Sequence, residues 1–187
     1  MNVARLSEEN IDRYGEYVSI VYEDTEYTNV QIERDGRGLA YALKKIGVNR
    51  GDRVIIQLPN SPEVLSSFQA IFKAGAVVVP INFLVGHDEL SHIYRDSGAT
   101  TVITSVEFMK QVAVAKADAP NMKNVILIDG VLPGTLSYVE LVDNSSDQLE
   151  ALDTDDDELA ALIYTAGTTG KPKGVMLTHK ALYTNAY

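Results

Sequence analysis

Residues suited to phosphate binding concentrate in the stretch from Tyr164 to His179, YTAGTTGKPKGVMLTH. It holds three glycines, four threonines and two lysines, and it follows directly on an apolar run. Glycines permit positive φ and let backbone N–H groups approach a ligand without a Cβ in the way. Threonines add hydroxyl donors and lysines add positive charge, a combination that suits a polyphosphate. A plain surface turn accounts less well for their coincidence.

The stretch is not the common P-loop. That pattern around Gly170 and Lys171 would need glycine at Thr165 and serine or threonine at Pro172. The candidate residues of the stretch are therefore considered by type: Gly167, Gly170 and Gly174; Thr165, Thr168 and Thr169; Lys171 and Lys173.

Other candidate motifs have weaker support. His87 and His92 are five residues apart on a predicted helix, so they do not share a face as metal ligands at i and i+4 would. The acidic run from Asp153 has carboxylates at the first, third and fifth positions of a calcium loop. However, Glu158 occupies the position that requires glycine, and Tyr164 occupies the twelfth position, which requires Glu, so a solvated acidic turn is favoured. For His179, a structural role and a contact with substrate both remain open.

Gly36 and Gly38 could begin a G-x-G dinucleotide fingerprint. Position 41 is Tyr41 rather than glycine and no strand directly precedes the pair, so we expect close helix packing instead.

Composition limits the kind of protein and its partners. The 187 residues are 45% hydrophobic and carry a net charge of -10, which fits a globular domain and disfavours a nucleic-acid partner. The charge is uneven, because residues 159–187 contain three lysines and no acid and are therefore +3, against -13 for the rest. There is no cysteine, so disulfides and thiolate sites are excluded. No signal-type or membrane-spanning run occurs, and we expect a soluble, cytoplasmic protein.

The elements that must position these residues alternate between strand and helix. Two strands over residues 17–28 precede a helix that begins with a capping box at Thr28 and Gln31 and ends near Ile46. Apolar runs then predict buried strands at 53–59, 76–81, 100–105, 124–129 and 159–165, and a further strand is expected at 174–179; helices are expected at 62–74, 86–98, 106–117 and from Lys180. Residues 130–157 are expected to be a connecting region with one short helix near 138–142. This pattern predicts an α/β fold with a mostly parallel sheet flanked by helices.

The stretch YTAGTTGKPKGVMLTH resembles the phosphate-binding signature of the adenylate-forming superfamily, which includes acyl-CoA synthetases, adenylation domains of peptide synthetases and luciferases. The resemblance extends over most of the chain, since GDRVIIQLPNSPEVLSSFQAIFKAGAVVVPIN and GHDELSHIYRDSGATTVIT are similar to the amino-terminal region of the family in order and spacing.

The resemblance implies a reaction in two steps. ATP and a carboxylic acid give an acyl-adenylate and pyrophosphate, and a thiol, usually that of coenzyme A, then takes the acyl group. The implied substrates and cofactors are ATP, Mg²⁺, coenzyme A and a small carboxylic acid, with a fatty acid first among the acids. The sequence is compatible with a homo-oligomer and does not determine an oligomeric state.

By the same resemblance, the β- and γ-phosphates would be held by Thr165, Gly167, Thr168, Thr169, Gly170, Lys173 and Gly174. Lys173 matches the lysine of the P-K-G triplet of the family and is the candidate catalytic residue, whereas Lys171 ranks lower. Ala166 departs from the pattern, because many members carry serine there. No metal ligand is predicted.

The family's later motifs and its small carboxy-terminal catalytic domain have no counterpart in the chain. We therefore expect residues 1–187 to be an incomplete, amino-terminal portion of the large AMP-binding domain. The leading hypothesis is part of an acyl-CoA synthetase. The alternatives are an adenylation domain of a peptide synthetase and a non-catalytic nucleotide-binding module.

Overall fold

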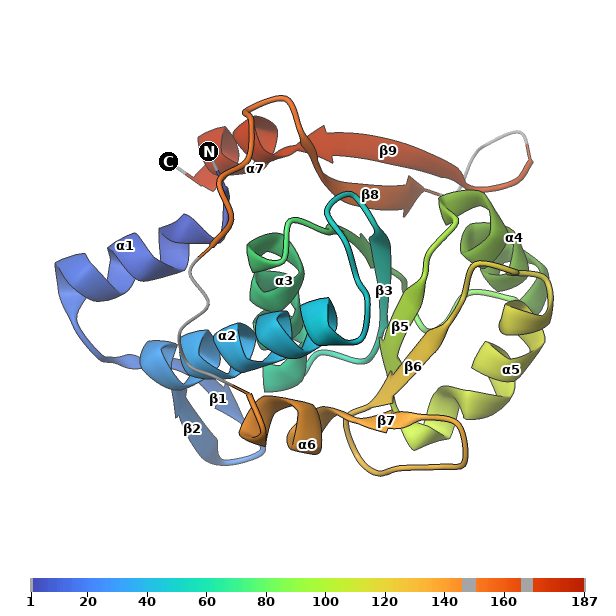
Figure 1. Cartoon of the computed structure of the whole chain (residues 1–187), viewed down its shortest axis with the longest axis horizontal. Coiled ribbons are helices and arrows are strands. Elements are labelled where there is room, and N and C mark those ends of the chain that lie inside the picture. The colour runs from blue at the N-terminus through green and yellow to red at the C-terminus, as the bar shows by residue number, and fades with distance from the viewer. Residues whose placement is uncertain (1, 146–150, 166–169, 187) are drawn as a thin grey trace.

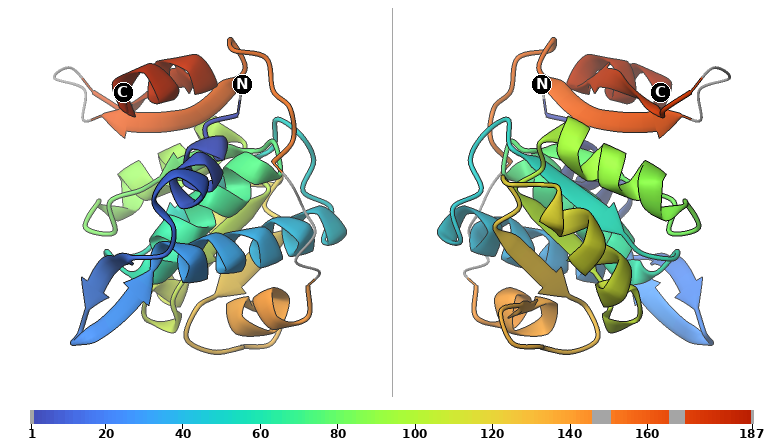
Figure 2. Two further views of the ribbon diagram at one scale, coloured as in Figure 1. Left: turned by 90° about the vertical axis from the view of Figure 1, so that its left-hand side faces the viewer. Right: turned by 90° about the vertical axis from the view of Figure 1, so that its right-hand side faces the viewer.

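A seven-stranded sheet covered by helices on both faces forms the centre of the molecule (Figures 1 and 2). The computed structural model describes residues 2–145, 151–165 and 170–186. The strand order is β7-β6-β5-β3-β4-β8-β9, and every neighbouring pair is parallel except β8 and β9. The predicted α/β class with a mostly parallel sheet is confirmed.

The strands of this sheet are β3 (Arg53–Gln57), β4 (Val77–Pro80), β5 (Thr101–Thr104), β6 (Asn124–Leu127), β7 (Leu136–Ser137), β8 (Leu159–Thr165) and β9 (Lys173–Thr178). The helices are α1 (Arg5–Tyr14), α2 (Asn29–Lys45), α3 (Pro62–Lys73), α4 (His87–Ser97), the 3₁₀ turn Val106–Phe108, α5 (Met109–Ala117), α6 (Tyr138–Asp143) and α7 (His179–Ala186). No helix among the described residues combines the length and apolar character that a membrane span requires.

Successive residues of the central strands enter two different cores, which explains why their sequences are apolar throughout. Val54 and Ile56 of β3 belong to the core that α2, α3 and α6 complete, whereas Ile55 belongs to the core that α4 and α5 complete. Side chains of a strand point alternately to the two faces, so both faces of the sheet are buried.

The hairpin of β1 (Val18–Tyr22) and β2 (Thr25–Thr28) forms a separate two-stranded sheet and leads into α2, as the sequence predicts. The predicted capping box at the start of α2 is present. The Gln31 amide donates to Thr28 Oγ1 at 3.1 Å, and the Thr28 amide donates to Gln31 Oε1 at 2.9 Å. Ser61 stands at the N-cap of α3 as predicted, but its hydroxyl makes no capping bond.

Gly36 and Gly38 serve helix packing, as expected. A Cβ at Gly36 would meet the Gln69 side chain at 3.0 Å, and one at Gly38 would lie 2.7 Å from Ser145 Oγ and 3.0 Å from the Val142 carbonyl. The two glycines therefore let α2 approach α3 and the end of α6.

Three features differ from the sequence-based prediction or were missed by it. The polar amino-terminal segment, for which no helix was predicted, forms α1. The region 130–157 contains the short strand β7 in addition to α6, and β7 pairs with β6. The last strand, β9, runs antiparallel to β8. β7 is only two residues long, so a local pattern does not reveal it, and α1 makes contacts with distant residues such as Lys73.

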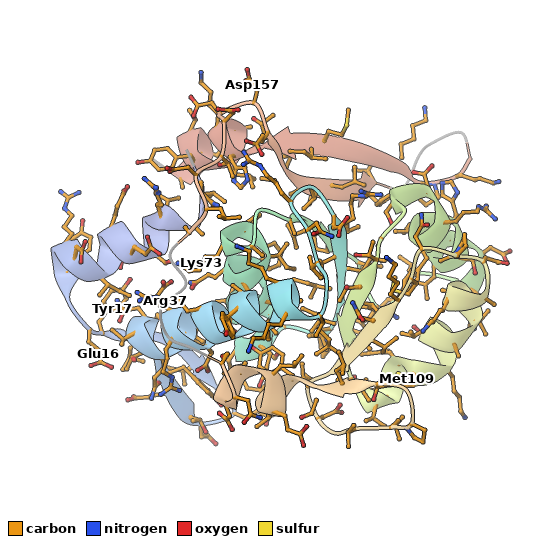
Figure 3. The ribbon with its side chains drawn as sticks, viewed as in Figure 1. Glu16, Tyr17, Arg37, Lys73, Met109 and Asp157 are labelled. Atoms are coloured by element: carbon orange, nitrogen blue, oxygen red, sulfur yellow. The ribbon has the colours of Figure 1, made fainter. Side chains whose placement is uncertain are left out.

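A buried ion cluster fixes α1 and α2 to the end of α3. Lys73, which is labelled in Figure 3, has no exposed surface. Its ammonium lies 2.7 Å from Glu33 Oε1 and contacts the Glu8 carboxylate. Ser7 donates to Glu33, and Arg37 Nε lies 3.1 Å from the same carboxylate. Glu33 is itself buried, so the cluster satisfies charges from three helices at once.

We expect Lys73→Met to destabilise the chain by about 3–5 kcal/mol, because the variant leaves the buried Glu33 carboxylate without its ammonium partner. The double variant Lys73→Met with Glu33→Leu should recover a large part of that loss, since both charges are then removed. Urea unfolding followed by circular dichroism measures both effects. The matched control is Lys180→Met, whose exposed ammonium lies 3.9 Å from Asp156 and should contribute less than about 1 kcal/mol. A double variant as unstable as the single one would contradict a charge-based cause.

Candidate functional site

Thr165 and Lys173, two of the predicted phosphate-binding residues, lie at one end of the β8–β9 hairpin (Figure 1). Thr165 is the last residue of β8 and Lys173 is the first of β9, and the two are direct cross-strand partners. Both residues are exposed. The side chains of Thr165 and Lys173 therefore start from neighbouring backbone positions, one before and one after the glycine-threonine segment, residues 166–172.

Part of this segment can be placed. Gly170 has a φ of +150°, a backbone conformation that favours glycine, and it is exposed together with Lys171. Pro172 between the two lysines is buried. The predicted residues Gly167, Thr168 and Thr169, and the departure at Ala166, lie outside the described residues.

Packing against the neighbouring strand requires glycine at position 174, which the sequence did not reveal. It is a strand residue paired with Tyr164, and a Cβ at this position would lie 2.8 Å from Leu162 Cδ1 and 3.3 Å from Tyr164 Cζ. The absent side chain leaves room for those two residues on the neighbouring strand. Gly174 thus helps to set the position of Tyr164, which directly precedes Thr165.

Helix α4 contacts Tyr164, two residues before the segment, and Pro172, the last residue of the segment. Nε2 of His92 lies 3.0 Å from the carbonyl oxygen of Pro172, and the Tyr164 hydroxyl donates to Asp96 Oδ2 at 2.7 Å. Burial and the neighbouring Asp96 carboxylate raise the pKa of Tyr164, so it remains a neutral donor at physiological pH. Sequence reasoning compared His92 with His87 and missed its relation to Asp96, which is four residues further along the same helix face.

His179 has a structural role, which resolves the two interpretations that the sequence left open. Its ring is buried, its Nδ1 accepts a hydrogen bond from the Val3 amide at 3.2 Å, and it packs edge-on against Phe72. Burial lowers its pKa and favours the neutral ring that this acceptor role requires.

An ion pair fixes the other end of the hairpin. Arg50 Nε donates to Glu158 Oε2 at 2.7 Å, and a second guanidinium nitrogen contacts the other carboxylate oxygen. The Glu158 carbonyl accepts the His179 amide at 3.0 Å. Glu158 directly precedes β8 and His179 directly follows β9, so these bonds close the hairpin at its base.

Carboxylates of the acidic run before β8 form ion pairs with arginines of the body of the protein. These pairs do not support a role of the run in metal binding. Asp153 pairs with Arg5, and Glu158 pairs with Arg50. Within the described ranges, three or more His, Cys, Asp or Glu side chains do not gather into a group that could hold a metal ion. The described part of the candidate site consequently offers donors and positive charge for phosphate oxygens, and it does not offer a ligand set for Mg²⁺.

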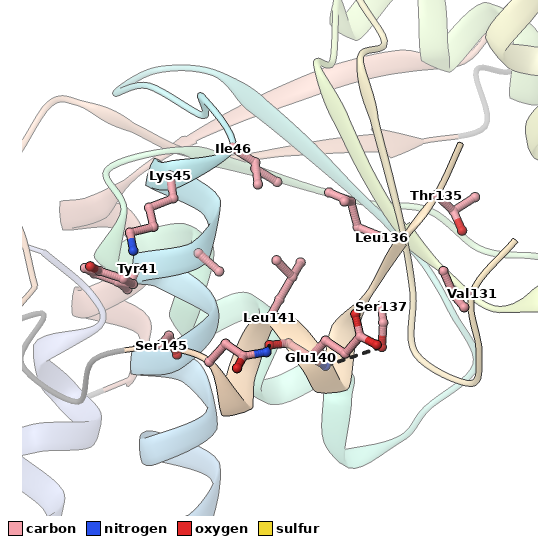
Figure 4. Close-up of a pocket in the computed structure, with 12 residues that line it drawn as sticks. Tyr41, Lys45, Ile46, Val131, Thr135, Leu136, Ser137, Glu140, Leu141 and Ser145 are labelled. Carbon is pink, nitrogen blue, oxygen red and sulfur yellow. Dashed lines mark hydrogen bonds between the residues drawn. The ribbon is translucent and has the colours of Figure 1, made fainter. Parts of the chain in front are cut away.

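Two of the cavities that lie away from the predicted residues have distinct linings. One, of about 390 Å³, is bounded by α2, β7 and α6 and includes Tyr41, Lys45 and Leu136 (Figure 4). The other, of about 530 Å³, lies beyond the carboxyl ends of β3 and β4, between Leu58 and Phe83. After β3 the chain enters α3 on one face of the sheet, and after β4 it enters α4 on the opposite face. The gap between two such strands is a topological switch point, where open α/β sheets bind ligands. Because β8 runs parallel to β4, the glycine-threonine segment leaves the same edge of the sheet.

Comparisons with known proteins agree with this arrangement. A family model described as AMP-binding enzyme matches residues 7–187. A medium/long-chain-fatty-acid and 3-oxocholest-4-en-26-oate CoA ligase of Mycobacterium marinum is 29% identical over 98% of this chain and 35% of its own length. 4-Coumarate:CoA ligase 1 of Petunia hybrida is 36% identical over 85% of this chain and 29% of its own length.

Among solved structures, that of an anthranilate CoA ligase in complex with anthranoyl-AMP superposes with a TM-score of 0.92. It is 29% identical, and the match covers 96% of this chain and 35% of that one. The chain thus spans about a third of the length of the proteins it matches.

The ion pair at the base of the hairpin predicts a pH dependence. The hydrogen bonds from Arg50 lower the pKa of Glu158 from 4.5 to about 2. A carboxyl group with a lowered pKa stabilises the fold above its unfolded pKa, and the contribution is lost as the pH falls through the folded value. We therefore expect Glu158→Gln to be less stable than the native chain at pH 7 and the difference to shrink between pH 4.5 and 2. Thermal unfolding at several pH values measures this.

Glu107→Gln, at an exposed position in the 3₁₀ turn, is the matched control and should track the native chain throughout this pH range. A stability difference between Glu158→Gln and the native chain that is as large at pH 2 as at pH 7 would contradict the role given to the ion pair.

Proposed function

The chain belongs to the AMP-binding enzyme family, and from this we propose that it supplies the site for the β- and γ-phosphates of ATP in an acid–thiol ligase. The complete activity proposed is the conversion of a carboxylic acid into an acyl-adenylate and the transfer of the acyl group to coenzyme A. The observation that carries the proposal is the pairing of exposed Thr165 with exposed Lys173 where the glycine-threonine segment leaves the hairpin.

The chemistry of the first step explains why such residues are needed. A carboxylate is a poor electrophile, and joining it to AMP gives the acyl carbon a good leaving group. Negative charge develops on the departing pyrophosphate, so donors and cations aimed at the β- and γ-phosphates stabilise the transition state. Bound Mg²⁺ would neutralise part of the same charge.

Lys173 is the proposed catalytic residue of this chain. Lys173 is exposed, and its antiparallel pairing with Thr165 fixes the backbone from which both side chains extend. Thr165, Gly170 and Gly174 would contribute from the described part of the site, together with Gly167, Thr168 and Thr169. Backbone N–H groups near Gly170 suit phosphate oxygens because no Cβ hinders their approach.

The proposed acid is a fatty acid, and a planar aromatic acid is the second candidate. The relative from Mycobacterium marinum is a fatty-acid and steroid-acid ligase by name, and those from Petunia hybrida and the anthranoyl-AMP complex are ligases of aromatic acids. All three names specify coenzyme A, which supports coenzyme A as the thiol over the carrier thiol of a peptide synthetase.

We further propose that residues 1–187 are the amino-terminal portion of the AMP-binding domain. The relatives are about three times as long, since the match covers 35% and 29% of two of them. We expect the 187-residue chain alone to form no acyl-adenylate from ATP, Mg²⁺ and dodecanoate or 4-coumarate. Pyrophosphate release coupled to hydroxamate trapping measures this, and acyl-hydroxamate formed by the isolated chain would refute it.

Calorimetric titration of the chain with ATP and Mg²⁺ tests the phosphate site directly. We expect measurable binding that Lys173→Ala weakens by about tenfold or more, because a charge-assisted hydrogen bond to a phosphate oxygen contributes roughly 1.5–3 kcal/mol. Thr169→Ala should weaken binding to a smaller extent. Lys180→Ala removes the same charge from α7, at the opposite end of the hairpin, and should leave the affinity close to that of the native chain (Figure 1). Equal affinity of the native chain and Lys173→Ala would contradict the proposal.

A further inference from the structure

Helix α4 contacts the chain at two residues, Tyr164 before the glycine-threonine segment and Pro172 at its end. Tyr164, just before the end of β8, donates to Asp96 at 2.7 Å, and Pro172, just before β9, lies with its carbonyl oxygen 3.0 Å from His92 Nε2. His92 and Asp96 are separated by one helical turn and lie on the same face of α4. The two contacts bracket the segment between them.

The bond from His92 has a definite direction. The Pro172 carbonyl can only accept, so the proton must be on Nε2 of His92. Proline has no backbone N–H, and its carbonyl is therefore the only backbone group through which Pro172 can form a conventional hydrogen bond. This bond holds a buried residue whose two neighbours, Lys171 and Lys173, are both exposed.

The helix that makes these contacts is itself fixed to the sheet. Leu90, Ile93 and Tyr94 of α4 are buried in the core below it. The Tyr94 hydroxyl, with no exposed surface, donates to the buried Gln57 Oε1 of β3 at 2.7 Å. Figures 1 and 2 both show α4 beside the end of the hairpin that carries the segment. A helix whose inner face is packed into the core therefore faces Tyr164 and Pro172.

We propose that His92 and Asp96 are positioning residues that set the spacing of the two sides of the phosphate site. The proposal rests on the function proposed above for the glycine-threonine segment. Neither side chain need touch ATP. Asp96 restrains Tyr164, next to Thr165, and His92 restrains Pro172, next to Lys173. Holding these neighbours reduces the freedom that Thr165 and Lys173 lose when they bind phosphate, and such preorganisation increases affinity.

Amide hydrogen exchange, read by mass spectrometry, tests the two contacts without any ligand. In the 187-residue chain, we expect His92→Ala and Tyr164→Phe each to accelerate exchange in the peptide 165–175 by roughly threefold to tenfold, as the loss of one hydrogen bond implies. His92→Gln, which keeps an N–H donor on a side chain of similar reach, should restore exchange to within about twofold of the native rate. The matched control is His87→Ala, at the exposed first residue of the same helix.

Titration with ATP and Mg²⁺ then connects the contacts to the site. We expect His92→Ala to weaken binding by about threefold to tenfold, and His92→Gln to recover most of that loss. A merely structural role would lower the stability of the chain and leave the affinity of its folded fraction unchanged.

The possible failures can be told apart. Native exchange rates in 165–175 for both His92→Ala and Tyr164→Phe would overturn the positioning role. So would accelerated exchange in these variants with unchanged affinity for ATP. A third outcome is that exchange responds as expected but the native chain binds no ATP. The two contacts then restrain Tyr164 and Pro172, but the proposed phosphate function fails for this chain, and the positioning role fails with it.

Discussion

The need to neutralise a buried ammonium organises one side of this molecule. Lys73 at the end of α3 has no contact with solvent, so its charge must be met by carboxylates. One comes from α2 as Glu33, and the other comes from α1 as Glu8. The amino-terminal segment consequently lies over α3, where the side-chain amide of Asn2 donates to the Phe72 and Leu152 carbonyls at 2.7 and 2.9 Å.

The same contacts extend to the hairpin that carries the candidate site. The Leu152 amide donates to the Lys73 carbonyl at 3.2 Å, and the Val3 amide donates to His179, so the chain is held just before β8 and just after β9. Arg50 closes the base through Glu158. The hairpin is thus fixed at its base by the region around the end of α3 and at its other end by α4. These contacts hold the described part of the hairpin on both sides of Thr165 and Lys173.

Local patterns predicted the parts of this structure that local physics determines. Apolar runs such as RVIIQ and VVVP indicated buried parallel strands, and both strands contribute residues to cores on the two faces of the sheet. The capping box at Thr28 likewise depends on residues three apart. The composition of the stretch after Tyr164 also indicated phosphate chemistry, because residue type alone supplies donors and charge.

Contacts between distant residues could not be derived in the same way. Lys73 meets Glu8 across 65 positions and His92 meets Pro172 across 80, and neither pair forms a recognisable spacing. α1 has no buried residue of its own, and its Glu8 takes part in one of these distant contacts, which the sequence did not reveal. The antiparallel direction of β9 depends on the connection between β8 and β9 rather than on the composition of either strand.

The charge distribution explains why positioning matters for the candidate site. Residues 1–158 carry a net charge of -13 and repel polyphosphates, whereas residues 159–187, which include the hairpin, carry a net charge of +3. A broad attractive field is therefore absent, and exposed charges further apart than about 8–10 Å are largely screened at physiological ionic strength. In the proposed function, affinity for phosphate comes from short-range bonds made by a few donors such as Thr165 and Lys173. Bonds of that kind depend steeply on distance and angle, so the proposed restraint of Tyr164 and Pro172 by α4 contributes where additional positive charge is absent.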